Sequence, residues 1–250
     1  MLILLPPSES KQTRTRGSAL RPEGLSAPGL TPARDRVVTA LSQVSERADA
    51  AAVLGVSPNL TAEIARNTRV RSAPTLPARE LYSGVLYDAL DLASLDAGAS
   101  RRATARLRVV SALYGVVRMT DRLAPYRLSM AVNLPGVGPL AGFWRPHLDP
   151  VLTGAAGRGL VVDCRSSTYA AAWTPAATSD LARRWVHVRV PGATHMAKHT
   201  RGLVARALCQ DPADPRTPRA LAELLAGAFD VELHEPRRAG APWVLDALPG

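Results

Sequence analysis

The segment that follows the apolar N-terminal run carries side chains that could bind or transform a ligand. Ser8 to Lys11 have the S-x-x-K spacing of the acylating serine in penicillin-recognising enzymes. That chemistry needs both side chains on one face of a helix, and Pro6-Pro7 disfavours a helix here. A loop with hydroxyls and an amine at the end of a strand can instead hold an anion. We therefore interpret Ser10 and Lys11 as candidate ligand contacts.

Lysine is rare in this chain. Only Lys11 and Lys198 are lysines among the 31 basic residues. A lysine supplies a compact amine that can lose its proton, whereas arginine stays charged, so an arginine-rich chain keeps lysine mainly where such an amine is needed. Chance survival is the other explanation. Both lysines are therefore candidate functional residues.

The stretch "HMAKHTRG" offers two kinds of site. His195 and His199 lie four residues apart, a spacing that can bind a metal from one face of a helix. No acidic residue or third ligand lies nearby, so we expect surface histidines and no metal or other cofactor. Lys198 and Arg201 lie three residues apart on one side of the same helix, which suits a phosphate or a carboxylate.

The stretch "VVDCRSSTY" places Asp163, Ser166 and Tyr169 after a predicted strand. Polar residues at the carboxyl end of a strand are where open α/β sheets hold ligands. An ordinary loop between a strand and a helix is an equally good interpretation.

The net charge of +10 attracts polyanions, and nucleic acid is the first partner to consider. Apolar residues spaced by three and four predict a helix over residues 100–117. Arginines lie off that apolar stripe, where they form either a solvated basic face or a DNA-binding face. They are Arg101, Arg102, Arg106 and Arg108.

Strands and helices alternate along the chain and predict the fold that positions these residues. Strands are expected at 1–5, 126–134, 159–164, 185–191 and 229–234, and helices at about 32–55, 57–67, 197–210 and 218–229. With no linker or repeat, residues 1–250 are expected to form a single mixed α/β domain, with a mixed β-sheet core flanked by helices. No apolar run approaches the roughly 20 residues of a membrane span, and the start lacks a signal peptide. We therefore expect a cytoplasmic protein without a membrane partner, with Cys164 in a strand and Cys209 on a helix as free thiols.

The stretch "LPGVG" at residues 134–138 looks like the hairpin of a helix-hairpin-helix element. The entering residues alternate like a strand, and Pro139, Gly142 and Pro146 suit a following helix poorly. We therefore expect a turn between two strands.

Six segments resemble, in order, the YaaA family of bacterial peroxide-stress proteins: "MLILLPPSESK", "LYSGVLYDAL", "LRVVSALYGVVRMTDRLAPYRLSM", "GFW", "VVDCRSSTYAAAW" and "KHTRGLVARAL". They span nearly the whole chain. The resemblance implies a single-domain mixed α/β fold with a positively charged cleft, double-stranded DNA as partner with a preference for distorted DNA, and a role in limiting oxidative damage.

The resemblance also implies a helix-hairpin-helix-like element at Val109–Met119. A turn at Ala112–Gly115 and a helix starting near Val116 would aim backbone N–H groups at a phosphate. Arg118 would add charge beside the four arginines named above. The family often has glycine at the position of Ala112, and alanine resists the positive φ of such a hairpin.

Two hypotheses for function follow, a DNA-binding protective protein and an enzyme with an anion-gripping pocket for a nucleotide, nucleoside or nucleobase-like molecule. The DNA-binding candidates are Arg101, Arg102, Arg106, Arg108 and Gly115. The catalytic candidates are Lys11, Tyr114, Asp121, Ser166, Tyr169 and Lys198, and the ligand-binding candidates are Ser10, Tyr82, Arg118, Tyr126, Arg127, Arg201 and Gly202. Thr168 replaces an acidic residue that the family tends to carry, which would alter an activity that needs this carboxylate. No oligomeric state follows from the sequence.

Overall fold

A seven-stranded sheet forms the centre of the protein, which a computed structural model describes over residues 1–192 and 194–249. Its strand order is β10 (Phe229–His234), β11 (Trp243–Pro249), β9 (Trp185–Arg189), β8 (Val161–Asp163), β1 (Leu2–Leu5), β3 (Leu107–Ser111) and β4 (Gly115–Val117). The five strands from β11 to β3 are parallel, and β10 and β4 are antiparallel to their neighbours. The continuous apolar run of β1 is buried, as expected for a parallel strand covered on both faces.

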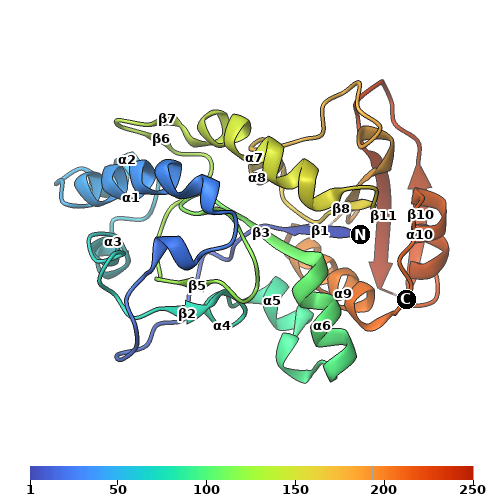
Figure 1. Ribbon diagram of the computed structural model, residues 1–250, viewed down its shortest axis with the longest axis horizontal. Coiled ribbons are helices and arrows are strands. Elements are labelled where there is room, and N and C mark those ends of the chain that lie inside the picture. Colours follow the sequence, from blue (N-terminus) through green and yellow to red (C-terminus); the bar gives the residue numbers. More distant parts are fainter. Residues whose placement is uncertain (193, 250) are drawn as a thin grey trace.

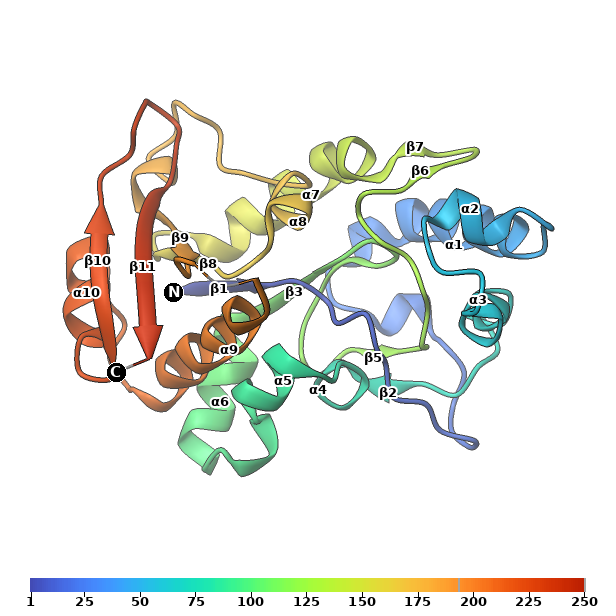
Figure 2. The same ribbon diagram turned by 180° about the vertical axis from the view of Figure 1, so that it is seen from behind.

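Helices cover both faces of this sheet. α7 (Leu140–Ala156) and α8 (Ser167–Ala170) lie on one side of β1, and α5 (Val85–Leu90), α6 (Ala97–Arg106) and α9 (Thr194–Gln210) lie on the other (Figures 1 and 2). α10 (Pro218–Leu225) lies beside β10. The mixed α/β architecture predicted from the sequence is confirmed.

The remaining elements gather at the end of the molecule opposite β10 and β11 (Figure 1). They are α1 (Thr31–Ser45), α2 (Ala50–Leu54), α3 (Thr61–Asn67), α4 (Ala78–Leu81) and two small sheets, β2 (Leu76–Pro77) with β5 (Arg122–Leu123) and β6 (Asn133–Leu134) with β7 (Gly138–Pro139). Short 3-10 turns lie at Pro22–Gly24, Pro28–Leu30, Leu92–Ser94 and Ala182–Arg184. Buried side chains from both ends form one continuous core.

The predicted helix over 100–117 is wrong beyond Arg106. Asp96 caps the start of α6, because its side chain accepts from the amide of Ala99 at 2.7 Å, and the helix ends at Arg106, where β3 follows. Residues 107–117 then form the β3–β4 hairpin. Their apolar spacing fits a helix, but consecutive buried valines also fit a strand paired with β1, and periodicity alone does not separate the two.

The expected helix start near Val116 is therefore also wrong. The turn between β3 and β4 is closed by Ser111, whose Oγ accepts the amides of Leu113 at 3.2 Å and Tyr114 at 3.0 Å. These N–H groups already have an acceptor inside the fold. The amides of Leu113 and Tyr114 are therefore not free to donate to a DNA phosphate, as the expected hairpin would require.

The turn at 134–138 joins β6 to β7, as the sequence predicted, with Gly136 at a φ of 82°. The expected strand over 126–134 reduces to Asn133–Leu134. The expected helix over 32–55 is split into α1 and α2, and the next helix, α3, begins at Thr61.

α7 contradicts the expectation that residues after 138 suit a helix poorly. It contains Pro146 and Pro150, yet it buries a stripe of apolar residues spaced by four, namely Leu140, Trp144, Leu148, Leu152 and Ala156. Burial of this stripe outweighs the cost of two prolines. β11 was also missed, because its apolar residues follow a proline-rich segment without a clear alternation.

The two thiols are free and buried; Cys164 directly follows β8, and Cys209 lies on α9. Among the helices of the described residues, none combines the length and the apolar composition needed to cross a bilayer.

Candidate functional site

A cavity of about 640 Å³ opens at the carboxyl ends of β1 and β8. Because these strands are parallel neighbours, the segments that follow them, 6–11 and 164–169, meet at one edge of the sheet. The rest of its wall comes from α9 and from residues 55–56, 83–87 and 127–129. The cavity brings together the predicted residues Ser10, Lys11, Arg127, Ser166, Tyr169, Lys198 and Arg201. Its volume lies in the range of small-molecule sites.

Lys11 is held firmly at this cavity. Its backbone forms an antiparallel bridge with Tyr82. Its Nζ donates to the carbonyl oxygens of Ser8 at 2.7 Å and Glu9 at 3.3 Å, and lies 4.1 Å from the ring centroid of Tyr126. Burial and the nearby cation of Arg127 lower the pKa of Lys11 to about 7, although Glu63 and Glu9 oppose the shift.

Tyrosines form a buried layer beneath Lys11. The hydroxyl of Tyr126 lies 2.7 Å from Ser111 Oγ and 3.4 Å from the hydroxyl of Tyr82, and Tyr82 stacks on Tyr87. Burial raises the pKa of all three phenols well above the ordinary value, so they stay protonated. Tyr82 and Tyr126 therefore supply ring faces and neutral hydroxyls near the amine.

Arg127 lies at the cavity wall between two carboxylates, at 3.1 Å from Glu9 and 3.5 Å from Glu63. Its backbone is fixed by Asn67, a buried residue that sequence reasoning missed. A single asparagine inside a short helix gives no pattern that could have revealed this contact.

α9 supplies two cations. Arg201 donates through Nε to the carbonyl of Val188 at 3.1 Å, and Lys198 is exposed at the cavity rim. Ser166 is the N-cap residue of α8 and Tyr169 lies within it; burial raises the pKa of Tyr169 to about 12. The prediction that these residues surround a common site agrees with their positions, and their roles stay predictions.

Asp163 does not face the cavity as a free carboxylate. It accepts from Arg165 Nε at 2.8 Å and Nη2 at 2.7 Å, and from Trp185 Nε1 at 3.2 Å. Both members of the pair are fully buried, and Arg165 also donates to the carbonyls of Tyr169 and Trp173. Arg165, which sequence reasoning missed, thus anchors α8 to the sheet.

Several candidates have structural contacts away from the cavity. Asp121 is buried and accepts from the amides of Ser26 at 3.1 Å and Arg118 at 3.0 Å, and the Arg118 side chain is exposed. The hydroxyl of the buried Tyr114 donates to the carbonyl of Ala124 at 3.1 Å. These contacts place Tyr114, Asp121 and Arg118 outside the candidate active site.

Both candidate glycines are needed for close packing. Gly115 has a φ of 72°, and a Cβ there would lie 2.7 Å from Trp144 of α7. At Gly202 of α9 a Cβ would overlap the carbonyl oxygen of Leu86 in α5. Neither position is among the residues that line the cavity.

The expected basic face of α6 is largely used inside the fold. Arg106 is buried and donates to carbonyls that follow α9, including Asp211 at 3.0 Å and Ala213 at 2.8 Å. Arg102 donates to the carbonyls of Cys209 at 2.7 Å and Gln210 at 2.6 Å. Arg108 donates to backbone carbonyls of its own segment, and Arg101 is exposed. The expectation of a solvated basic face is therefore wrong at Arg106 and Arg102.

A different basic surface lies next to the cavity. A small hollow of about 80 Å³ shares Glu9, Ser10 and Lys11 with it, and a larger hollow of about 430 Å³ shares Arg66 and Pro125 with the small one. We call these three adjoining depressions the basic groove. Its cationic side chains are Lys11, Arg14, Arg66, Arg69, Arg127, Lys198 and Arg201, against the carboxylates Glu9 and Glu63.

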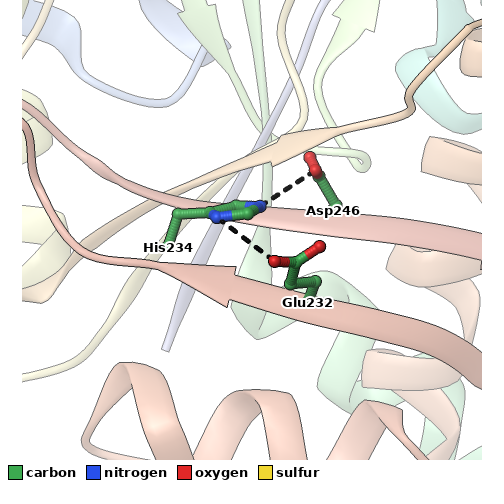
Figure 3. A group of neighbouring side chains, drawn as sticks. All are labelled: Glu232, His234 and Asp246. Carbon is green, nitrogen blue, oxygen red and sulfur yellow. Dashed lines mark hydrogen bonds and ion pairs between the residues drawn. The ribbon is translucent and has the colours of Figure 1, made fainter.

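One cluster away from the groove has side chains that could ligate a metal. Figure 3 shows His234 between Asp246 and Glu232, with Nε2 at 3.0 Å from Asp246 and Nδ1 at 3.7 Å from Glu232. Both oxygens of Asp246 also accept from Arg189, whose cation would oppose a divalent ion. The cluster is best described as an ion-paired network that joins β9, β10 and β11. The histidine pair expected on α9 includes His195, whose side chain lies outside the described part of the chain.

Comparisons with known proteins identify the family. A family model described as "Peroxide stress protein YaaA" matches residues 1–233. The "UPF0246 protein SCO2297" of Streptomyces coelicolor is 47% identical over 99% of this chain and 98% of that protein. The "UPF0246 protein CE1889" of Corynebacterium efficiens is 38% identical over 95% of this chain and 97% of that protein. The chain therefore belongs to the YaaA family of peroxide stress proteins.

Proposed function

We propose that this protein limits peroxide damage by binding double-stranded DNA along the basic groove. The observation that carries the proposal is the set of six cationic side chains that, together with Lys11, line three adjoining depressions, where the described lining residues include two carboxylates. Cations arranged along a groove match the repeating phosphates of a duplex, and each contact releases counterions and adds affinity without reading sequence.

The helix pair at one rim of the groove supports this proposal. α2 and α3 are joined through Gly55, which has a left-handed φ of 63°, and both Gly55 and Val56 line the cavity. We assign the helix-hairpin-helix-like element to this pair instead of the β3–β4 hairpin. Arg66 of α3 and Arg69, just beyond it, extend the pair toward the arginine-rich end of the groove.

A salt titration of duplex binding tests the DNA proposal. Arg66→Gln with Arg69→Gln removes two groove cations, and Arg237→Gln with Arg238→Gln removes two exposed cations between β10 and β11, at the opposite end of the molecule. The groove variant should bind intact and bulged duplexes more weakly. The slope of log binding constant against log salt concentration should become less steep by about 0.9 for each phosphate contact that is lost. The control should bind like the wild-type protein. Equal loss in both variants would show non-specific attraction and overturn the proposal.

A second candidate function is an enzyme that acts on a nucleotide-like small molecule. It is favoured by the 640 Å³ cavity, where Arg127, Lys198 and Arg201 can hold an anion and Tyr169 can pack against a planar ring. A thermal-shift screen with nucleotides and nucleobases tests it, because a ligand that binds the native state raises the melting temperature. A rise that is lost in Arg201→Gln supports this function, and no rise with any compound of the screen argues against it.

A further inference from the structure

We propose that Lys11 is a nucleophile that forms an imine with an aldehyde carried next to a phosphate. The inference rests on the ligand site proposed above and assigns a reaction to it. The phosphorylated aldehyde can be a free small molecule or the ring-opened sugar of an abasic site in DNA, since both present the same two groups.

The position of Lys11 gives a carbonyl compound access to its amine. Lys11 lines both the 640 Å³ cavity and the small hollow beside it, so its side chain lies where the two meet. Its backbone is fixed by the bridge to Tyr82 and by the bond from the Gln12 amide to the Leu81 carbonyl at 2.8 Å. The amine is therefore presented from a rigid element, as a nucleophile requires.

The two hydrogen bonds of Nζ orient its lone pair. A neutral amine has two N–H bonds and one lone pair. The carbonyl oxygens of Ser8 and Glu9, at 2.7 Å and 3.3 Å, accept two N–H bonds from Nζ. Neither partner is a donor, so the lone pair of the neutral amine stays available for attack.

The surrounding charges favour both a neutral amine and a bound phosphate. Burial and Arg127 lower the pKa of Lys11 to about 7, so about half of the amine is unprotonated near neutral pH. Glu9 and Glu63 oppose this shift, and the Tyr82 and Tyr126 hydroxyls stay neutral. Arg127, Lys198 and Arg201 line the same cavity and can hold the phosphate beside the aldehyde.

The reaction needs no redox partner. The Nζ lone pair attacks the aldehyde carbon, a C–N bond forms, and the C=O π pair moves to oxygen. A proton passes from nitrogen to that oxygen, and the carboxylates of Glu9 and Glu63 in the small hollow are available to relay it. Loss of water then leaves the imine, so amine and aldehyde give imine and water.

Reductive trapping on the full-length protein tests the proposal. The protein is incubated near pH 7 with sodium cyanoborohydride and one of three probes: glycolaldehyde phosphate, propionaldehyde without a phosphate, or a duplex with one abasic site. Peptide mass mapping then locates the reduced adduct. The assignment is unambiguous because the chain has only two lysines, and the N-terminal amine, the third candidate, is bound to Asp214 at 2.8 Å.

We expect the adduct on Lys11 with at least one phosphate-bearing probe, on the order of tenfold faster than on the exposed Lys198 and faster than with propionaldehyde. Lys11→Arg keeps a long basic side chain but cannot form the imine, and it should lose the adduct. Trapping by the abasic duplex alone identifies DNA as the source, and trapping by glycolaldehyde phosphate alone identifies a small molecule. No adduct on Lys11, or adducts only on Lys198 or Met1, would overturn the proposal. Binding of an intact duplex, measured without reductant, separates this outcome from failure of the DNA proposal.

Discussion

Asn67 holds the backbone of Arg127 at both of its polar groups. Its Nδ2 donates to the carbonyl oxygen of Arg127 at 3.0 Å, and its Oδ1 accepts from the amide of Arg127 at 2.8 Å. The same Nδ2 lies 3.1 Å from Ser45 Oγ at the end of α1. The side-chain amide of Asn67 thus links α1 and α3 to the loop between β5 and β6 in which Arg127 lies.

Asn67→Ala should lower the free energy of unfolding by about 2–4 kcal/mol, because it leaves a backbone donor and acceptor without their partner. Urea denaturation measures this loss. Thr68→Ala is the control, since Thr68 is exposed and its hydroxyl donates to the nearby carbonyl of Ala65 at 2.9 Å, and it should change stability by less than about 0.5 kcal/mol. Equal losses in the two variants would show that the contact with Arg127 contributes nothing.

Gly202→Ala should destabilise the protein by about 1–3 kcal/mol, because a methyl group at this position forces α9 away from α5. Gly154→Ala is the matched control: Gly154 also lies inside a helix, and a Cβ built there meets no atom within 4 Å apart from its chain neighbours and the backbone of its own helix. The control should gain up to about 1 kcal/mol from the higher helix propensity of alanine. Thermal unfolding of both variants measures the difference. A tolerated Gly202→Ala would disprove the close packing.

The sequence was informative where an element has one dominant signal. The apolar run of β1 and the polar residues after it predicted a strand followed by a ligand-binding loop, and the structure places Lys11 in that loop. Lys198 and Arg201 could be placed on one helix from their spacing alone. The loop after β1 meets the segment after β8 because these two strands are parallel neighbours, and β9, which precedes α9, pairs in parallel with β8.

The sequence was misleading where two signals compete. Residues 107–117 have apolar spacing that suits a helix, and only their pairing with β1 decides for a hairpin. α7 has prolines that argue against a helix, and only its buried stripe decides for one. The burial of Arg106 could not be predicted either. Its position on the helix gives no information about the backbone carbonyls after α9, which lie far away in the sequence and accept its hydrogen bonds.

Arg106→Ala should therefore destabilise the fold and leave DNA affinity of the folded protein unchanged. It removes a buried guanidinium from several carbonyls after α9, which should cost about 2–4 kcal/mol. Arg101→Ala is the control on the same helix, since its side chain is exposed. Urea denaturation of both variants measures the loss of stability, and duplex binding by both variants measures DNA affinity. A DNA-specific loss in Arg106→Ala would restore the basic face of α6 as the binding surface.

The lowered pKa of Lys11 should make the stability of the protein depend on pH in a defined window. The pKa is about 7 in the fold and about 10.5 in the unfolded chain, so the unfolded chain binds more protons between these values. The free energy of unfolding must therefore rise with pH between about 7 and 10.5. Below pH 7 the amine is protonated in both states, and the full cost of burying its charge lowers the stability of the fold. The slope is at most about 1.4 kcal/mol per pH unit.

Lys11→Met isolates this contribution because it removes the titrating amine and keeps an unbranched side chain of comparable length. The free energies of unfolding of the wild-type protein and Lys11→Met are measured by urea denaturation at pH 6, 7, 8 and 9. Every other titrating group is common to both, so the wild-type value minus the variant value should be flat below pH 7 and rise above it. A difference that stays flat from pH 6 to 9 would mean that the amine keeps an ordinary pKa and is protonated at neutral pH, which would also remove the neutral nucleophile that imine formation requires.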